Sequence, residues 1–166
     1  MALKRSSSTI VIGARVTESA ANTFTELAVD LQLNPLDNEV FVVQAINLDV
    51  AAPDAIAATN TATEMSLTTT SQTAMPPLSS TNLLAKTNKA IRSDPVVAVG
   101  FSNAAGETPP ATLDYIGIIS TNDFFLQVEG SNNAGAKSGA CKVYGYRAKA
   151  DAATYAALVQ SEVLSS

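Results

Sequence analysis

The sequence predicts an all-β protein, folded as an antiparallel β-sandwich. Three observations support this fold class: segments in which apolar and polar residues alternate, a polar composition rich in Thr and other uncharged residues, and turn-forming residues between the segments. Hydrophobic residues make up 46% of the 166 residues, charged residues 15% and aromatic residues 5%. This composition is too apolar for a disordered chain, and the length suits one domain that buries a sizeable core.

Strand signals run through most of the chain. Residues 24–33 alternate strictly with a period of two, which indicates a half-buried strand. Residues 39–50 form the strongest segment, and both of its faces are apolar, as expected of a central strand. One face is predicted to carry Val40, Val42, Ile46 and Leu48 with Gln44, and the other Phe41, Val43, Ala45 and Asn47. Further strands are expected at 61–70, 95–101, 113–120, 124–129 and 141–149.

The remaining segments are a long irregular insertion and a helical tail. Residues 71–94 contain consecutive prolines and several serines, with a helix-like piece at 82–91. Asp151 is positioned to cap a short C-terminal helix. About eight strands with so little helix indicate an antiparallel sandwich rather than βαβ units, and long loops between some strands are typical of an eight-stranded jelly roll. The expected organisation is a basic, flexible N-terminal arm at 1–15, a β-sandwich domain at 16–150 and a helical tail at 151–166.

Residue types that carry catalysis are scarce. The chain contains no histidine, which removes the commonest general base and metal ligand. Cys141 is the only cysteine, so no internal disulfide can form, and its expected role is that of a small buried hydrophobe. Glu26 and Asp30 share the polar face of a predicted strand and are more simply a solvated surface than a catalytic pair. We therefore predict no catalytic residues, no metal site, no cofactor and no enzymatic activity.

Calcium coordination stays open as an alternative, because oxygen ligands lie in or beside predicted loops. The candidate ligands are Asp37, Asn38, Glu39, Asp49 and Asp54.

The charge distribution points to one basic segment in an acidic protein. The net charge of −5 argues against a protein whose whole surface binds nucleic acid. At the N-terminus, however, Lys4, Arg5 and Arg15 precede the first acid, Glu18. These three cations are candidate nucleic-acid-binding residues, and an ordinary disordered terminus is the alternative.

The tail is too short to be a stable free helix, so it packs on its own sandwich or on a neighbouring subunit. Its apolar side, formed by Tyr155, Leu158 and Val159, is a candidate subunit interface. The low charge density of the chain also favours a surface that neighbouring subunits cover. No segment has the length of a membrane-spanning helix, and no secretory signal is expected.

In overall layout the chain resembles the single jelly-roll coat proteins of small icosahedral viruses. The resemblance covers the basic segment from Met1 to Arg15 and the predicted strands between Thr23 and Lys149. It implies a virion structural protein, a capsid subunit that assembles with copies of itself into an icosahedral shell around the viral genome. It also implies assembly in the host cytoplasm and contacts with nucleic acid and other virion proteins. The basic arm is shorter than in many such proteins, so a minor or decorating role is also considered.

A carbohydrate-binding or adhesin-like β-sandwich module is the alternative function. Such modules offer exposed aromatic side chains on which sugars stack. The chain has no Trp and four Tyr, so this feature is weak. Self-association separates the two hypotheses, because a lectin module stays a small oligomer whereas a shell protein forms large closed particles.

Overall fold

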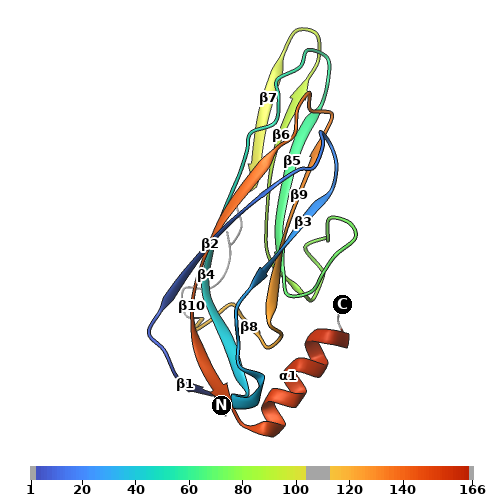
Figure 1. The fold of residues 1–166 in the computed structure, drawn as a ribbon. Coiled ribbons are helices and arrows are strands. Elements are labelled where there is room, and N and C mark those ends of the chain that lie inside the picture. Colours follow the sequence, from blue (N-terminus) through green and yellow to red (C-terminus); the bar gives the residue numbers. More distant parts are fainter. Residues whose placement is uncertain (1–2, 104–112, 165–166) are drawn as a thin grey trace.

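Two five-stranded antiparallel sheets pack face to face in the computed structural model, which describes residues 3–103 and 113–164 (Figure 1). Sheet A contains β1 (Leu3–Arg5), β2 (Ile10–Thr17), β4 (Glu39–Val50), β8 (Gly117–Ile119) and β10 (Ser138–Ala150). Sheet B contains β3 (Thr25–Asp30), β5 (Thr61–Thr68), β6 (Leu83–Ser93), β7 (Ala98–Asn103) and β9 (Asp123–Ser131). A short 3-10 helix, η1 (Pro35–Asp37), precedes β4, and helix α1 (Ala152–Leu164) follows β10. The predicted all-β sandwich with a short C-terminal helix is confirmed.

The strand order is that of a jelly roll. Sheet A runs β2-β10-β4-β8, and sheet B runs β3-β9-β5-β6, with β1 added beside β10 and β7 added beside β6. In each sheet a late strand therefore lies between two early ones: β10 separates β2 from β4, and β9 separates β3 from β5. This winding gives the eight-stranded arrangement of two Greek keys. It also means that neither sheet is complete until the end of the chain has been placed.

The main core lies between the two sheets. Alternate residues of β9 and β5 point into it, so Phe124, Leu126, Val128, Met65 and Leu67 are fully buried. The facing strands of sheet A contribute Val16, Phe41, Val43, Val50, Ile119, Cys141 and Val143, and the connection between β3 and β4 contributes Leu31 and Leu33.

A β-bulge in β4 changes which of its residues face this core. Tyr144 of β10 pairs with Ala45 and Gly145 pairs with Val43, so Gln44 has no residue opposite it. The extra residue reverses the alternation of β4. The predicted faces of this strand are therefore wrong: the sheets enclose Phe41 and Val43 before the bulge but Ile46, Leu48 and Val50 after it.

Before the bulge, the outer face of sheet A is apolar and carries a second, smaller core. Val40, Val42 and Ala148 are fully buried there. The residues packed against them come from β1, from the segment before β8, from β8, from β10 and from α1: Leu3, Tyr115, Ile118, Tyr146, Tyr155 and Leu158. The helical tail therefore covers its own sandwich at the lower end of Figure 1.

Two segments differ from the sequence-based expectation. Of the arm predicted at 1–15, residues 3–15 are not separate from the sandwich, because Leu3–Arg5 pair with β10 and Ile10–Thr17 continue along the same side of that strand. The helix-like piece at 82–91 is the strand β6, paired with β5. Non-local pairing overrides local helix preference here, because the alternation of β6 places Ala85 and Thr87 on the buried side.

We predict that Gly145→Ala destabilises the protein by about 1–3 kcal/mol, the usual cost of forcing extra atoms into a packed interior. An added Cβ would lie 2.3 Å from the Val42 carbonyl oxygen and 2.6 Å from the Phe41 ring. Urea unfolding measures the change in free energy. Gly13→Ala is the matched control, since its Cβ would meet nothing closer than 3.8 Å. Equal stability of the two variants would contradict the role given to the bulge.

Candidate assembly and nucleic-acid-binding surfaces

Strand β7 forms one edge of sheet B and is unusually exposed. It pairs with β6 on one side and, among the strands of residues 3–103 and 113–164, it is the last strand of sheet B on the other. All six of its residues are exposed, on both faces of the strand. Val97, Val99 and Phe101 are 57%, 49% and 58% exposed, although they are large apolar side chains. Figure 1 shows the β6–β7 hairpin at one end of the molecule, far from α1.

The register defines the two faces of this hairpin. Phe101 lies opposite Ala90, which in turn lies opposite Ala62 of β5, so the apolar side chains share the outer face of sheet B. Gly100 lies on the other face, opposite Ile91, and a Cβ added there would meet no atom within 4 Å. The hairpin therefore extends beyond the part of sheet B that sheet A covers.

The other sheet edges carry the features that discourage strand addition in soluble proteins, namely charge, shortness and cover. Glu26 and Asp30 lie on β3. The Glu26 carboxylate accepts hydrogen bonds from Ser71 Oγ at 2.5 Å and Gln72 N at 2.7 Å, so the loop after β5 is tied to this edge. Arg15 lies on β2, and β8 has only three residues. By contrast, no charged residue occurs from Pro95 to Asn103.

The predicted basic residues do not all meet on one face. Arg15 lies opposite Ala140 on the exposed outer face of sheet A, and Lys142 follows two residues along β10 on the same face. The Arg5 guanidinium reaches this face as well, 4.2 Å above the Tyr146 ring. Lys4 lies on the opposite face of β1, beside Lys149.

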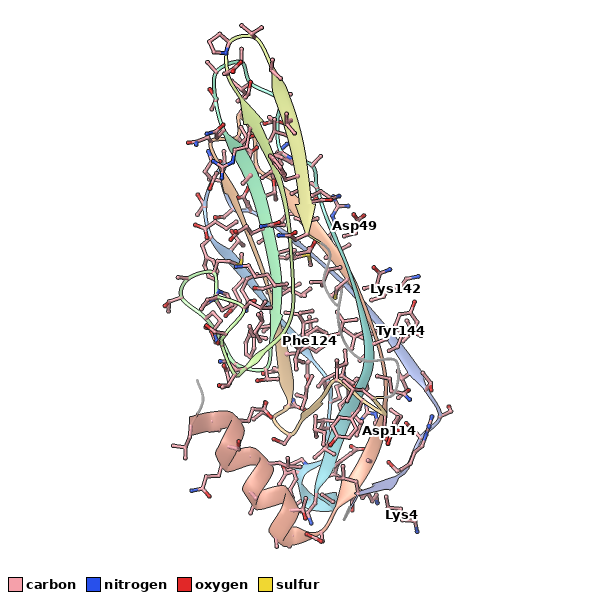
Figure 2. The ribbon with its side chains drawn as sticks, turned by 180° about the vertical axis from the view of Figure 1, so that it is seen from behind. Lys4, Asp49, Asp114, Phe124, Lys142 and Tyr144 are labelled. Carbon is pink, nitrogen blue, oxygen red and sulfur yellow. The ribbon has the colours of Figure 1, made fainter. Side chains whose placement is uncertain are left out.

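We call Arg5, Arg15 and Lys142 the basic face. Figure 2 shows Lys142 and the neighbouring Tyr144 pointing away from the buried Phe124. Among the ion pairs formed by the described residues, none involves a member of the basic face. Arg5 instead donates hydrogen bonds to Ser7 O and Thr9 Oγ1, and Arg15 donates one to Ser138 Oγ, so both guanidinium groups have neutral partners. Sequence reasoning missed Lys142, because only the pairing of β10 with β2 brings it beside Arg15.

The loop acids considered as calcium ligands are instead paired with cations. Their closest N–O distances are 3.5 Å for Asp37 with Lys149, 3.2 Å for Glu39 with Arg147, 3.6 Å for Asp49 with Lys89 and 2.6 Å for Asp54 with Lys137. The hydrogen bond from the Lys137 ammonium lowers the pKa of the Asp54 carboxyl group. Among residues 3–103 and 113–164, no group of three or more acids and cysteines could hold a metal ion.

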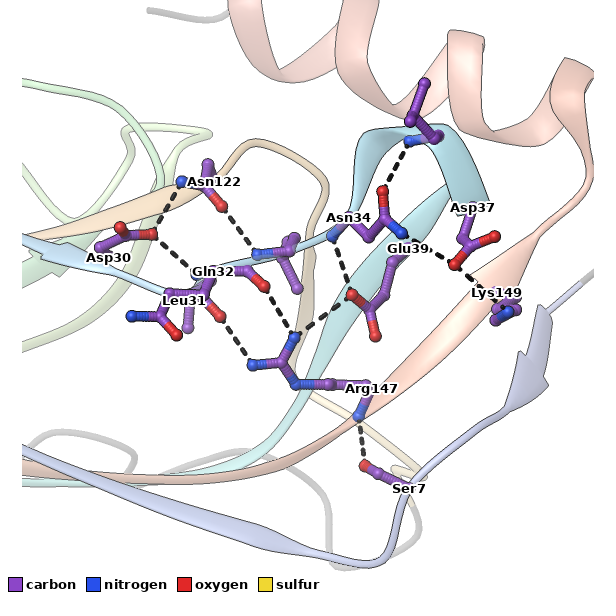
Figure 3. A network of polar contacts seen from close by, with 12 residues as sticks. Ser7, Asp30, Leu31, Gln32, Asn34, Asp37, Glu39, Asn122, Arg147 and Lys149 are labelled. Carbon is purple, nitrogen blue, oxygen red and sulfur yellow. Dashed lines mark hydrogen bonds and ion pairs between the residues drawn. The ribbon is translucent and has the colours of Figure 1, made fainter.

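Figure 3 shows a network of polar contacts that includes Glu39, Asp37 and their cation partners. The Arg147 guanidinium donates hydrogen bonds to the carbonyl oxygens of Leu31 at 2.8 Å and Gln32 at 2.9 Å. It also contacts Glu39, which accepts a hydrogen bond from Asn34 N at 2.8 Å. The network holds the connection between β3 and β4 against β10.

Cys141 is enclosed in the main core, as expected from the sequence. Burial raises the pKa of its thiol to about 11, so the thiolate needed for nucleophilic chemistry does not form near neutral pH.

Helix α1 is fixed at both ends. Asp151 caps it by accepting a hydrogen bond from Thr154 N at 2.7 Å. Near the other end the buried Glu162 carboxylate accepts from Ser120 N at 2.8 Å and Ser120 Oγ at 2.7 Å. Tyr155 and Leu158 pack on their own chain, and Val159 is half-buried. That these three residues form a subunit interface stays a prediction.

No protein-family model and no curated protein matches the chain. Among solved structures, one weak match is the tailspike protein gp49 of Acinetobacter baumannii bacteriophage Fri1, a capsular polysaccharide depolymerase. The identity is 11% and the TM-score 0.17, and the match covers 73% of this chain but 20% of the tailspike. A match this weak supports no functional conclusion. Within the described part of the chain, no helix has the length and apolar character needed to cross a membrane.

We predict that Glu162→Ala loosens α1 and lowers stability by about 1–3 kcal/mol, because the buried Ser120 amide loses its acceptor. Urea unfolding and limited proteolysis of the tail measure the two effects. Gln160→Ala on the exposed side of the same helix is the control and should leave both unchanged. An unaltered cleavage rate in the Glu162 variant would show that this carboxylate does not hold the helix.

We predict that the double change Arg15→Ala with Lys142→Ala weakens binding to single-stranded RNA or DNA. The slope of log K against log salt should fall by roughly 1.4, since each lost phosphate contact to a single strand contributes about 0.7. Fluorescence anisotropy at several salt concentrations provides the measurement. Arg92→Ala removes an exposed cation from the outer face of sheet B and is the control. If Arg92→Ala weakened binding as much as the double change, the basic face would not be the binding surface.

Proposed function

We propose that this protein is a virion structural protein, a capsid subunit that assembles with copies of itself into an icosahedral shell around the viral genome. The observation that carries the proposal is the uncharged, apolar edge strand β7, which is exposed on both faces. An exposed sheet edge of this kind can pair with a strand of another chain, and proteins that function as monomers normally prevent such pairing. The jelly roll supports the proposal, since viral capsid domains use this architecture, although lectin domains do too.

The charge distribution suits a shell subunit with one side turned towards a genome. The net charge of −5 keeps free subunits soluble, while the basic face presents three cations on one side of sheet A. Three cations give little affinity for nucleic acid alone, but many copies in one shell multiply it. Under this proposal the protein acts in the virion after assembly in the host cytoplasm, and it performs no catalysis.

We predict that the purified protein forms closed particles tens of nanometres across at near-neutral pH, because a shell of many 17.1 kDa subunits reaches that size. Light scattering and negative-stain electron microscopy measure the particles, over a series of protein and salt concentrations. Nucleic acid is added in a parallel series, to separate self-sufficient assembly from assembly that needs a genome.

A monodisperse monomer or small oligomer under all these conditions would overturn the proposal of a self-assembling shell. Binding of the same sample to a glycan array would then favour the carbohydrate-binding alternative.

A further inference from the structure

We propose that two copies of this chain join through β7, antiparallel and across a two-fold axis, so that sheet B continues from one subunit into the next. This inference rests on the proposed self-assembly and names the contact that begins it. The partner of β7 must be another strand, because an open sheet edge presents alternating N–H and C=O groups that only extended backbone matches. A second copy supplies such a strand in its own β7.

Charge favours β7 as the place at which two copies meet. Two chains that each carry a net charge of −5 repel one another, so contact between them is easiest where both surfaces are neutral. The segment from Pro95 to Asn103 is neutral, whereas β3 carries Glu26 and Asp30 and β2 carries Arg15. Pairing β7 with β7 therefore brings no like charges of the two strands together.

The sequence of β7 also defines a register. With Gly100 on the two-fold axis, Gly100 of each copy faces Gly100 of the other. Val99 of each copy then lies opposite Phe101 of its partner, on the outer face that these side chains share with Ala90. The axis thus creates two pairs of an aromatic with a β-branched residue, a favourable cross-strand combination. The opposite face carries only the small residues Ala98, Gly100 and Ser102, so no side chain obstructs the approach.

The small area that this contact buries limits its affinity. Six residues of strand span roughly 20 Å. A single added strand on each side buries well below the ~800 Å² per partner of a standard stable interface. We therefore expect a weak dimer in dilute solution. The contact becomes persistent when several different contacts per subunit act together in a closed shell.

A charged residue introduced at position 100 tests the proposed two-fold axis directly. Gly100 has open space around its missing Cβ and an ordinary backbone conformation, so Gly100→Lys leaves the folded monomer intact. In the proposed pair, however, two ammonium groups face each other across the axis, which opposes pairing. We expect roughly tenfold weaker self-association, or more, together with loss of particles. Gly100→Glu should behave in the same way.

Mixing the two variants provides the decisive arm. An equal mixture of the Gly100→Lys and Gly100→Glu proteins places opposite charges across the axis, so it should recover association and particles. Gly135→Lys is the matched control, because Gly135 is also exposed and has no atom within 4 Å of a Cβ. That variant should assemble as the unmodified protein does.

A disulfide measures the pairing without requiring particles. Cysteines introduced by Gly100→Cys meet at the axis, so mild oxidation should give a covalent dimer much faster than it does for Gly135→Cys. The native Cys141 is buried and does not compete.

The outcomes separate this contact from shell formation. Unimpaired particles from the Gly100→Lys protein would overturn the β7 pairing and leave the proposed function standing. If neither variant associates and their equal mixture does not associate either, β7 does not pair with β7 and contacts a different surface. Rapid Gly100→Cys cross-linking without particles under any condition would support the pairing and overturn the shell. Equal cross-linking at positions 100 and 135 would overturn the pairing whether or not particles form.

Discussion

The close approach of two backbones at Gly145 is the constraint on which the rest of this structure depends. A Cβ at position 145 would clash with the Val42 carbonyl oxygen and the Phe41 ring, so only glycine fits beside the bulge at which Gln44 has no residue opposite it. The bulge lets one long strand pair, β4 with β10, serve two cores on opposite faces of sheet A. The outer face of β4 is apolar before the bulge, at Val40 and Val42, and polar after it, at Asn47 and Asp49, so the sandwich needs a cover on its outer surface only before the bulge.

The two terminal segments, β1 and α1, provide this cover. Leu3 of β1 and Tyr155 and Leu158 of α1 close the second core, and the Glu162 contact with Ser120 holds the helix in place. After the bulge the outer face of sheet A is exposed and carries Arg15 and Lys142, while Arg5 of the basic face lies before the bulge, opposite Ala148. Apolar surface at the far end of sheet B has no such cover within the described chain: β7 is exposed on both faces. The molecule thus has a covered end at α1, a basic face on sheet A and an exposed edge at β7, an arrangement that agrees with the proposed assembly.

Much of the fold was predictable, and the errors have identifiable causes. Alternation located β4 at 39–50 and most of the other strands, because period two requires no knowledge of what pairs with what. Two kinds of information were missing. A bulge is a property of two strands together, so residues 40–48 alone could not show where the alternation reverses. Residues 82–91 by themselves indicate a helix, because the alternation of β6 involves small and polar residues whose burial depends on β5 beside them.

For the candidate surfaces too, some properties could be predicted from the sequence and others depend on which strands pair. The sequence by itself determined that the protein is a β-sandwich without histidine-based chemistry, that its N-terminal segment is basic and that residues 95–103 form an uncharged, apolar stretch. Those properties reside in residue types and short-range periodicity. Only the tertiary structure decided that Arg15 and Lys142 share a face, that Lys4 does not join them and that β7 lies at an open edge. The physical reason is the jelly-roll winding, in which the last strands insert between the first, so the neighbours of each residue come from distant parts of the chain.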